Sequence, residues 1–285
     1  DFGYLGGGQH YSGGARSSIE RIDYSNDTAT ALVKGKLPNT RAYNAGTGNA
    51  SFGYFGAGRG APSSPSLLKS SVDRIDYSND TATASPKGPL NIIKIHLKAT
   101  GNASFGYFGG GSTPSLISSV DRVDYANDTA TASPRGPLSS VLSQLGAVSS
   151  REYNNPFKGP GNLEALVSLA PFSRNFGPQG TDFGYYAGGS PSGPYVTTVD
   201  RVDYSNDTGT APSKGPLASA RGYFGATSSA SFGYFAGGAA PSLLSTIDRI
   251  DYSNDGVTAV AKGLLSAAKR GIAATGNVSF GYFGG

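Results

Sequence analysis

The chain has 285 residues, a formal charge of +4 and a pI near 9.1, and it contains 43 Gly, 17 Pro, 17 Tyr and 14 Phe. Such frequent Gly beside so many aromatic residues indicates tight turns between short strands, because disordered chains are poor in aromatics. The basic residues are spread evenly and no apolar run approaches the roughly 20 residues that span a bilayer, so we expect neither nucleic-acid binding nor membrane insertion.

Two phrases recur along the sequence. Phe-Gly-Tyr, followed by small residues, begins at positions 2, 52, 105, 183, 232 and 280. The phrase Arg-Ile/Val-Asp-Tyr-Ser/Ala-Asn-Asp begins five times, at spacings of 53, 48, 79 and 48 residues. Its shared positions are Arg21, Arg74, Arg122, Arg201 and Arg249, then Asp23, Asp76, Asp124, Asp203 and Asp251, then Tyr24, Tyr77, Tyr125, Tyr204 and Tyr252. The chain begins with Asp1 inside a repeat and contains no Met, so we expect a processed product or a fragment.

Each unit contains four runs that fit short strands. In the unit 51–103 these runs are 52–55, 71–77, 81–85 and a stretch within 90–100. Ser78-Asn79-Asp80 lies between the second and third runs, and Asn and Asp favour turns because their side chains bond the nearby backbone. Four antiparallel strands in about fifty residues predict the blade of an all-β propeller.

The long interval of 79 residues leaves the number of blades open. Arg151-Glu152-Tyr153-Asn154-Asn155 looks like a worn copy of the Arg phrase, which favours a single domain over 1–285 of about six four-stranded blades. The units then lie near 1–50, 51–103, 104–138, 139–181 (degenerate), 182–230 and 231–285. Five or seven blades are alternatives; with five, the region 139–181 is an insertion that contains a short amphipathic helix.

The repeat resembles the kelch repeat, a family of β-propeller units. The resemblance rests on Tyr107-Phe108-Gly109-Gly110, Asp124-Tyr125 and Gly215-Pro216-Leu217 with Arg221, and this chain lacks the Trp of kelch repeats. The phrases Gly-Tyr-Phe-Gly-Gly-Gly and Arg-Ile-Asp-Tyr-Ser-Asn-Asp-Thr-Ala-Thr are also similar to those of large virion-associated proteins of tailed phages that infect marine bacteria. That resemblance implies a virion or extracellular location.

The charged residues argue against an enzyme. Of the 19 acidic residues, 15 occupy three positions in the five repeats: the Asp or Glu directly before the Arg phrase and the two Asp residues within it. A catalytic cluster is a single asymmetric site, whereas a residue present in every unit serves something that every unit needs. We therefore expect each Arg to bond carboxylates or carbonyls of its own or the adjacent blade. Without Cys and with only His10 and His96, we predict no catalytic residues, no metal site and no cofactor.

These features predict a non-enzymatic structural or adhesion protein, a phage virion fibre, tail or surface component that uses a propeller as a rigid binding platform. Contact loops are expected over 59–69, 112–118 and 190–197, and a possible interface includes Tyr153, Phe157, Phe172 and Phe176. The partner would be a protein, either a virion component or a second copy, or a host surface glycan. The alternative is a secreted carbohydrate-binding propeller of cellular origin, with Tyr11 and Tyr195 as stacking residues. A propeller enzyme is a further alternative, against which the absence of Cys and Trp argues.

Overall fold

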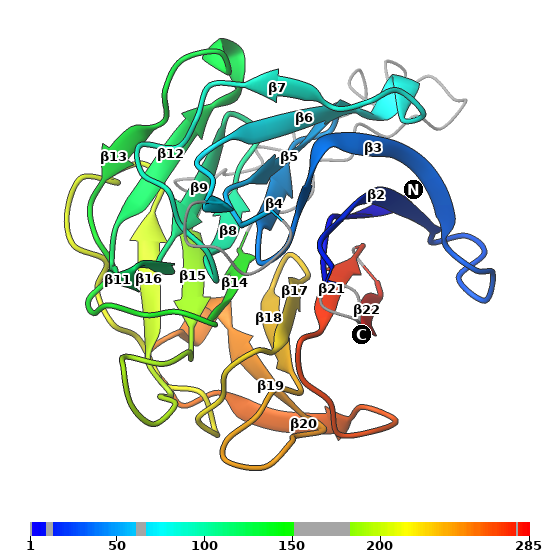
Figure 1. Ribbon diagram of the computed structural model, residues 1–285. Coiled ribbons are helices and arrows are strands. Elements are labelled where there is room, and N and C mark those ends of the chain that lie inside the picture. The colour runs from blue at the N-terminus through cyan, green and yellow to red at the C-terminus, as the bar shows by residue number, and fades with distance from the viewer. Residues whose placement is uncertain (1, 10–13, 61–66, 151–182, 278) are drawn as a thin grey trace, which may run out of the picture.

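A computed structural model describes residues 2–9, 14–60, 67–150, 183–277 and 279–285. Its small antiparallel sheets stand in a ring around a central axis, which is the arrangement of a β-propeller (Figure 1). The first sheet contains β1 (Phe2–Gly6), β2 (Arg16–Asp23) and β3 (Leu32–Arg41). The second contains β4 (Ala45–Gly48), β5 (Phe52–Gly56), β6 (Val72–Asp76) and β7 (Ser85–Lys87).

The remaining sheets repeat this order. The third sheet contains β8 (Lys98–Gly101), β9 (Phe105–Gly109), β12 (Val120–Asp124) and β13 (Ser133–Arg135), beside a small hairpin of β10 (Ser112–Thr113) and β11 (Ser115–Leu116). The fourth contains β14 (Gly146–Ser149), β15 (Phe183–Ala187) and β16 (Val199–Asp203). The fifth contains β17 (Gly225–Ser228), β18 (Phe232–Ala236), β19 (Thr246–Asp251) and β20 (Val260–Leu264). A two-stranded sheet of β21 (Ala273–Gly276) and β22 (Gly281–Gly284) follows.

The all-β propeller predicted from the repeats is confirmed, with five sheets of three or four strands as in the alternative blade count. The division into blades differs from the predicted units. The stretch 98–101, expected to close one unit, forms β8 and pairs with β9, so it opens the next sheet as its innermost strand. The repeat period does not show where one sheet ends and the next begins, because the strands on the two sides of that boundary are all short and similar in sequence.

The region 139–181 does not form a sheet of its own among the described residues. Strand β14 pairs directly with β15 in register from Gly146↔Ala187 to Ser149↔Gly184. Residues 151–182, which lie outside the described residues, therefore join two neighbouring strands of the fourth sheet. This pairing corrects the degenerate unit at 139–181 and fits the alternative of an insertion at that place.

The ends of the chain meet in the ring. The β21–β22 sheet lies between the fifth sheet and the first (Figure 1), and Tyr282 stacks on Tyr24 with ring centroids 5.3 Å apart. The Tyr282 hydroxyl donates to Asp27 at 2.8 Å, and the hydroxyls of Tyr24 and Thr275 share a hydrogen bond. These contacts join residues about 250 positions apart and close the ring.

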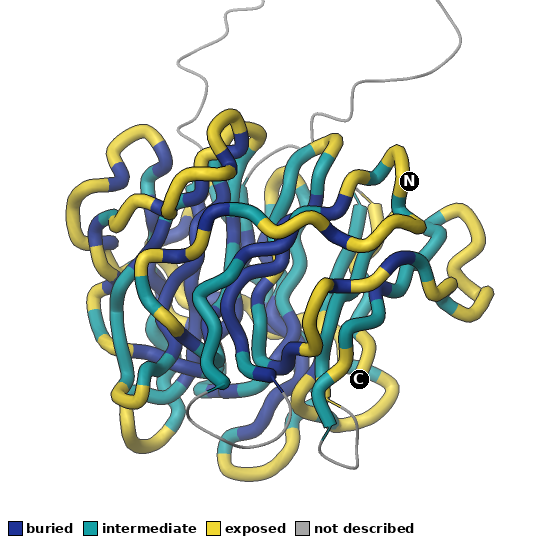
Figure 2. The backbone as a smooth tube through the Cα atoms, turned by 45° about the horizontal axis from the view of Figure 1, so that its top comes forward, coloured by how far each residue is buried: buried dark blue, intermediate teal, exposed yellow. Residues whose placement is uncertain are grey.

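Tyrosine pairs fill the space between neighbouring sheets. Tyr54 of the second sheet stacks on Tyr125 of the third at 4.5 Å, and Tyr107 of the third stacks on Tyr204 of the fourth at 4.7 Å. Gly56 allows this close approach, because a Cβ there would lie 2.7 Å from the Phe108 ring. Buried residues consequently concentrate inside and between the sheets, while the loops at both ends of the ring are exposed (Figure 2).

Candidate functional site

Four of the five repeated Arg residues connect their sheet to the next by an ion pair, and Arg249 forms none within the described residues. The Arg74 guanidinium lies 2.7 Å from a carboxylate oxygen of Asp128 in the following sheet, and the Tyr54 hydroxyl donates to the same oxygen at 3.0 Å. A second cation, Lys87, lies 3.1 Å from the other oxygen of Asp128. We call this set of one Tyr, two cations and the Asp of the next sheet the latch. The other latches are centred on the ion pairs Arg21–Asp80, Arg122–Asp207 and Arg201–Asp255, each at 2.8 Å.

Backbone contacts complete each latch. The amide of Gly88 donates to the Asp128 carbonyl at 2.8 Å, and a Cβ at Gly88 would lie 1.9 Å from the Ala130 carbonyl oxygen. Burial raises the pKa of Tyr54, and its hydrogen bond to ionised Asp128 acts in the same direction. The Tyr therefore remains a donor at any physiological pH.

The three acidic positions of the repeat phrase have three different roles. Asp76, the middle one, caps the 3₁₀ turn η2 (Tyr77–Asn79) by accepting from the Ser78 amide at 2.9 Å and the Ser78 hydroxyl at 2.6 Å. These hydrogen bonds lower the pKa of Asp76. Equivalent Asp residues cap η3 (Tyr125–Asn127) and η5 (Tyr252–Asn254). The last position, Asp80 or Asp128, belongs to the latch.

The first acidic position is a buried Asp in four of the five repeats, and in three of these it meets a cation from outside the repeat phrase; in the first sheet it is Glu20, which is half-buried. Arg41, whose side chain has no exposed surface, pairs with Asp73. Lys94 pairs with Asp121, and Arg221 with Asp248, each at 3.0 Å. In the fourth sheet Leu142 replaces the cation, and Asp200 instead accepts from the amide and hydroxyl of Ser139 at 2.9 and 2.7 Å and from the Ser213 hydroxyl at 3.0 Å. The repeated residues that form these contacts therefore belong to the scaffold.

A different set of residues surrounds the axis at one end of the ring. Each innermost strand is preceded by one residue with a positive φ: Tyr43 (58°), His96 (56°), Gln144 (59°), Tyr223 (58°) and Gly271 (72°). Backbone hydrogen bonds link them in a chain, from the His96 amide to the Tyr43 carbonyl (3.2 Å), then Gln144 to His96 (3.0 Å), Tyr223 to Gln144 (3.0 Å) and Gly271 to Tyr223 (2.7 Å). We call these five residues the axial collar.

Six non-glycine residues of the described part have a positive φ; four of them belong to the collar, and the other two are Ala57 and Ser192. A side chain at positive φ costs of the order of 1 kcal/mol relative to Gly, and such strain concentrates where function requires it. Only Gly271 is the residue that this geometry favours, whereas Tyr, His, Gln and Tyr occupy the other four positions. The sequence signal was available, since each collar residue lies six positions after a Leu of the outer connection: Leu37, Leu90, Leu138, Leu217 and Leu265.

The collar presents aromatic rings and positive charge. The His96 ring lies 4.2 Å from the Tyr43 ring and 6.0 Å from the Tyr223 ring, measured between centroids. The guanidinium of Arg59 lies 4.8 Å above the Tyr43 ring. Burial lowers the pKa of His96 to about 4, and the charges of Arg59 and Lys98 act in the same direction. Over the described residues, neither Arg59 nor Lys98 forms an ion pair with a carboxylate.

The predicted contact loops begin beside the collar. Isolated bridges join Ala42 to Arg59, Ile95 to Ser112 and Ser143 to Ser190, so each of the three loops starts next to a residue that precedes the collar. Tyr195, one of the predicted stacking residues, lies against Gly222, because a Cβ at that glycine would be 2.2 Å from its ring. The other predicted stacking residue, Tyr11, and the predicted interface residues Tyr153, Phe157, Phe172 and Phe176 lie outside the described residues.

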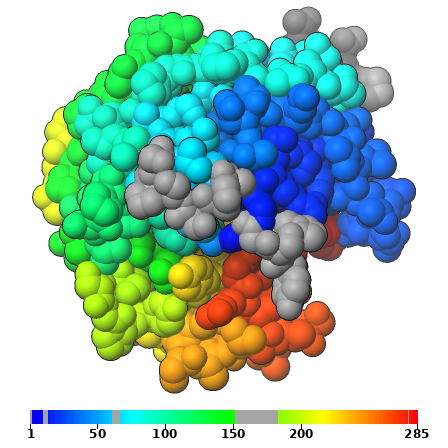
Figure 3. Space-filling view, in the orientation of Figure 1, coloured from blue at the N-terminus to red at the C-terminus, as the bar shows by residue number. Residues whose placement is uncertain are grey.

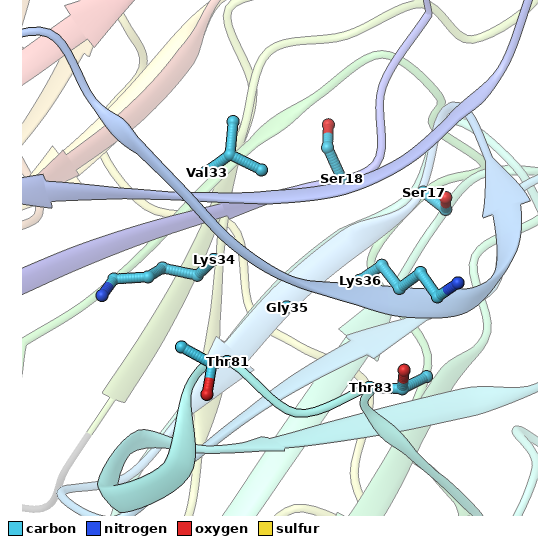
Figure 4. A pocket seen from close by; sticks show the side chains of 8 residues that line it. All are labelled: Ser17, Ser18, Val33, Lys34, Gly35, Lys36, Thr81 and Thr83. Carbon is cyan, nitrogen blue, oxygen red and sulfur yellow. The ribbon is translucent and has the colours of Figure 1, made fainter.

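A depression of about 380 Å³ lies elsewhere, at the seam between the first two sheets. Ser17, Ser18, Lys34, Lys36, Thr81 and Thr83 are among its lining residues (Figure 4). Lys34 is engaged with Asp80 at 3.5 Å, and the backbone at Gly35 packs directly on the Ala82 carbonyl. We regard this depression as part of the first latch.

The described ranges offer neither a cluster of metal ligands nor a membrane-spanning helix. They contain no group of three or more His, Cys, Asp or Glu side chains placed to hold a metal ion. No helix there has the length and apolar character required to cross a bilayer.

The class of protein defined by these features is a β-propeller with a scaffold of repeated latches and an irregular axial collar. No protein-family model matches the chain, and no curated protein matches it. Among solved structures, one titled "Structure of YjhT" is similar with a TM-score of 0.65 over 96% of this chain and 84% of that chain. The sequences are 11% identical, so the similarity concerns the fold alone.

Proposed function

We propose that this chain is a non-enzymatic adhesion protein, a surface component of a virion, whose axial collar binds an acidic glycan. The observation that carries the binding site is the collar, where Tyr43, His96 and Tyr223 place rings around the axis. Arg59 and Lys98 lie beside these rings and form no ion pair within the described residues. Aromatic rings stack on the apolar faces of sugars, and unpaired cations attract a carboxylate or sulfate group. Neutral His96 supplies a hydrogen-bond donor between them.

The non-enzymatic assignment is supported by the use of the acidic residues. The repeated carboxylates are engaged in turns, latches and buried ion pairs, as for Asp76, Asp128 and Asp73. A general acid or base needs a carboxyl, imidazole or similar group beside the substrate. At the collar, His96 has a pKa lowered to about 4, which makes it a poor general base near neutral pH.

The surface location is supported by the sequence of the repeat, which is similar to repeats in virion-associated proteins of marine tailed phages. Immunogold labelling of particles that carry this sequence, with an antibody against the chain, tests it. Gold at a fixed exterior position is expected, and gold found only in the cell lysate and never on particles would contradict it.

Glycan binding is tested on an array of paired neutral and acidic glycans. We expect binding to acidic members, weakened at least tenfold by Lys98→Gln and by Tyr223→Asn, where Asn tolerates the positive φ. Arg249→Gln, which removes a charge far from the collar in the fifth sheet, is the matched control and should bind as the natural chain does. Equal binding of neutral and acidic glycans would contradict the proposal, and so would binding that neither Lys98→Gln nor Tyr223→Asn weakens.

A further inference from the structure

The innermost strands of the ring begin with very small residues. Strands β4, β8, β14, β17 and β21 surround the axis (Figure 1), and each begins two residues after its collar residue. Nine of the ten residues in the first two positions of these strands are Gly or Ala, namely Ala45, Gly46, Ala99, Gly146, Ala147, Gly225, Ala226, Ala273 and Ala274. The exception is Lys98, the first residue of β8. Lys98 is therefore the one charged side chain among these ten positions around the axis.

The strands that flank Lys98 offer it no carboxylate. The sheets follow one another around the ring in chain order, from blue to red (Figure 3), so β8 lies between β4 and β14. Neither of these two strands contains an acidic residue, and Lys98 forms no ion pair within the described residues. Lys94, four residues earlier, is also buried but lies 3.0 Å from a carboxylate oxygen of Asp121. Of these two neighbouring lysines, only Lys98 is left to bind an anion from outside the scaffold.

Lys98 is partly enclosed and lies close to the collar. Its side chain is half-buried, and burial lowers the pKa of Lys98 with no carboxylate of the described residues opposing that effect. Removing a cation from water without a partner is unfavourable, and an anionic group of a ligand would offset that cost. The charge of Lys98 also lowers the pKa of His96, two residues earlier. An anion at Lys98 would therefore lie beside the collar rings.

The collar limits how a ligand can reach Lys98. Backbone hydrogen bonds join the collar residues one after another around this end of the axis. The His96 ring has the rings of Tyr43 and Tyr223 beside it, with centroids at 4.2 and 6.0 Å. A sugar inside a chain is bonded to a neighbour on both sides and would need room along the axis for both. A terminal sugar has one such neighbour, so it can enter while the rest of the chain stays outside.

Two arginines beside the collar suit the part of an acidic chain that stays outside. The guanidinium of Arg59 lies 4.8 Å from the Tyr43 ring, and that of Arg270 lies 5.9 Å from the Tyr223 ring. Arg270 is exposed, and neither arginine forms an ion pair within the described residues. Positive charge is thus present at two places, at Lys98 on the innermost strand and beside the collar rings.

We propose that Lys98 binds the carboxylate or sulfate group of a terminal sugar, so that the collar recognises the end of an acidic glycan and not its interior. This inference rests on the proposed glycan binding and adds which part of the glycan is bound. The sugar lies against the rings of Tyr43 and Tyr223, and its anionic group reaches the Lys98 ammonium. An ammonium group donates up to three hydrogen bonds and binds either anion as a point charge. Gly146 and Ala147 of the neighbouring strand β14 leave room for that group.

The probes are oligosaccharides of equal length, titrated into the natural chain by isothermal calorimetry. One carries a uronic acid at its non-reducing end, one carries the same uronic acid in its interior, and one is neutral. We expect the terminal acid to bind at least tenfold more tightly than the internal acid, and Lys98→Gln to remove that preference. Lys36→Gln removes an exposed lysine that forms no ion pair within the described residues, and this matched control should keep the preference. A probe with a terminal sulfate in place of the uronic acid identifies which of the two anions Lys98 binds more tightly.

Two results would overturn the inference and leave acidic-glycan binding intact. The first is equal affinity for the terminal and internal acids, both above that for the neutral probe. The second is a preference for the terminal acid that Lys98→Gln does not change, with thermal unfolding as the check that this variant is folded. Equal affinity for all three probes would contradict the proposed function as well. The comparison of probes on the natural chain depends on no variant.

Discussion

Arg74→Gln and Arg249→Gln compare an arginine of a complete latch with an arginine that forms no ion pair within the described residues. Arg74 donates to Asp128 at 2.7 Å, and its side chain is 26% exposed. A hydrogen bond to a charged partner contributes about 1.5–3 kcal/mol, and the partial exposure of Arg74 moves the expected loss to about 1–2 kcal/mol. The loss stays below the roughly 3–5 kcal/mol of an isolated buried charge, because Lys87 and Tyr54 continue to hold Asp128.

Both changes also remove a guanidinium from an aromatic ring. Arg74 lies 4.2 Å from the Phe52 ring and Arg249 lies 4.0 Å from the Phe232 ring, so each variant loses a similar cation–π contribution of about 0.5–1 kcal/mol. That contribution cancels in the comparison. The difference between the two variants, about 1–2 kcal/mol, measures the ion pair of the latch.

Urea unfolding followed by far-ultraviolet circular dichroism is the suitable assay, because the chain has no Trp. We expect a clearly lower midpoint for Arg74→Gln and a nearly unchanged one for Arg249→Gln. Equal destabilisation by the two changes would refute the latch as the source of the effect, and it would show that stacking on the Phe ring carries the whole contribution of these arginines.

Three further predictions concern Gly88, Ser139 and His96. Gly88→Ala should destabilise by about 1–3 kcal/mol, because its Cβ meets a backbone oxygen 1.9 Å away, whereas Gly263→Ala should be neutral in the same melt. Ser139→Ala should lower the thermal midpoint, because buried Asp200 loses a hydroxyl donor; an unchanged midpoint would mean that this hydroxyl contributes nothing. His96 has a folded-state pKa of about 4 against 6.5 in the unfolded chain, so stability should fall as pH drops through 6.5 and level off below 4. Comparing His96→Asn with the natural chain between pH 7 and 4 isolates this effect, and parallel curves would contradict it.

The local structure of each unit was predictable from its own residues. Asp76 and Ser78 define the turn through contacts two residues apart, and glycines end the strand that begins at Phe52. Because these interactions are local and recur in every unit, the repeat phrases alone predict short antiparallel strands and a propeller. The commitment of the repeated Arg residues to the scaffold was likewise expected from their recurrence.

The partners of those residues depend on contacts between sheets. Arg74 and Asp128 are 54 positions apart, and no local pattern distinguishes the latch role of Asp128 from the capping role of Asp124. Strands β14 and β15 are separated in sequence by residues 151–182, so their pairing is also a long-range contact. The sequence at Arg151, which resembles the Arg phrase, suggested a separate unit there instead.

The axial collar exists only in the assembled ring. Tyr43, His96, Gln144 and Tyr223 have no single residue type in common, and they become neighbours because five similar turns converge on one axis. Arg249 has the same sequence context as Arg74, yet only the ring reveals that it faces a sheet with two strands. The sequence by itself determined what each unit is, and the closing of the ring decided which of its groups are paired.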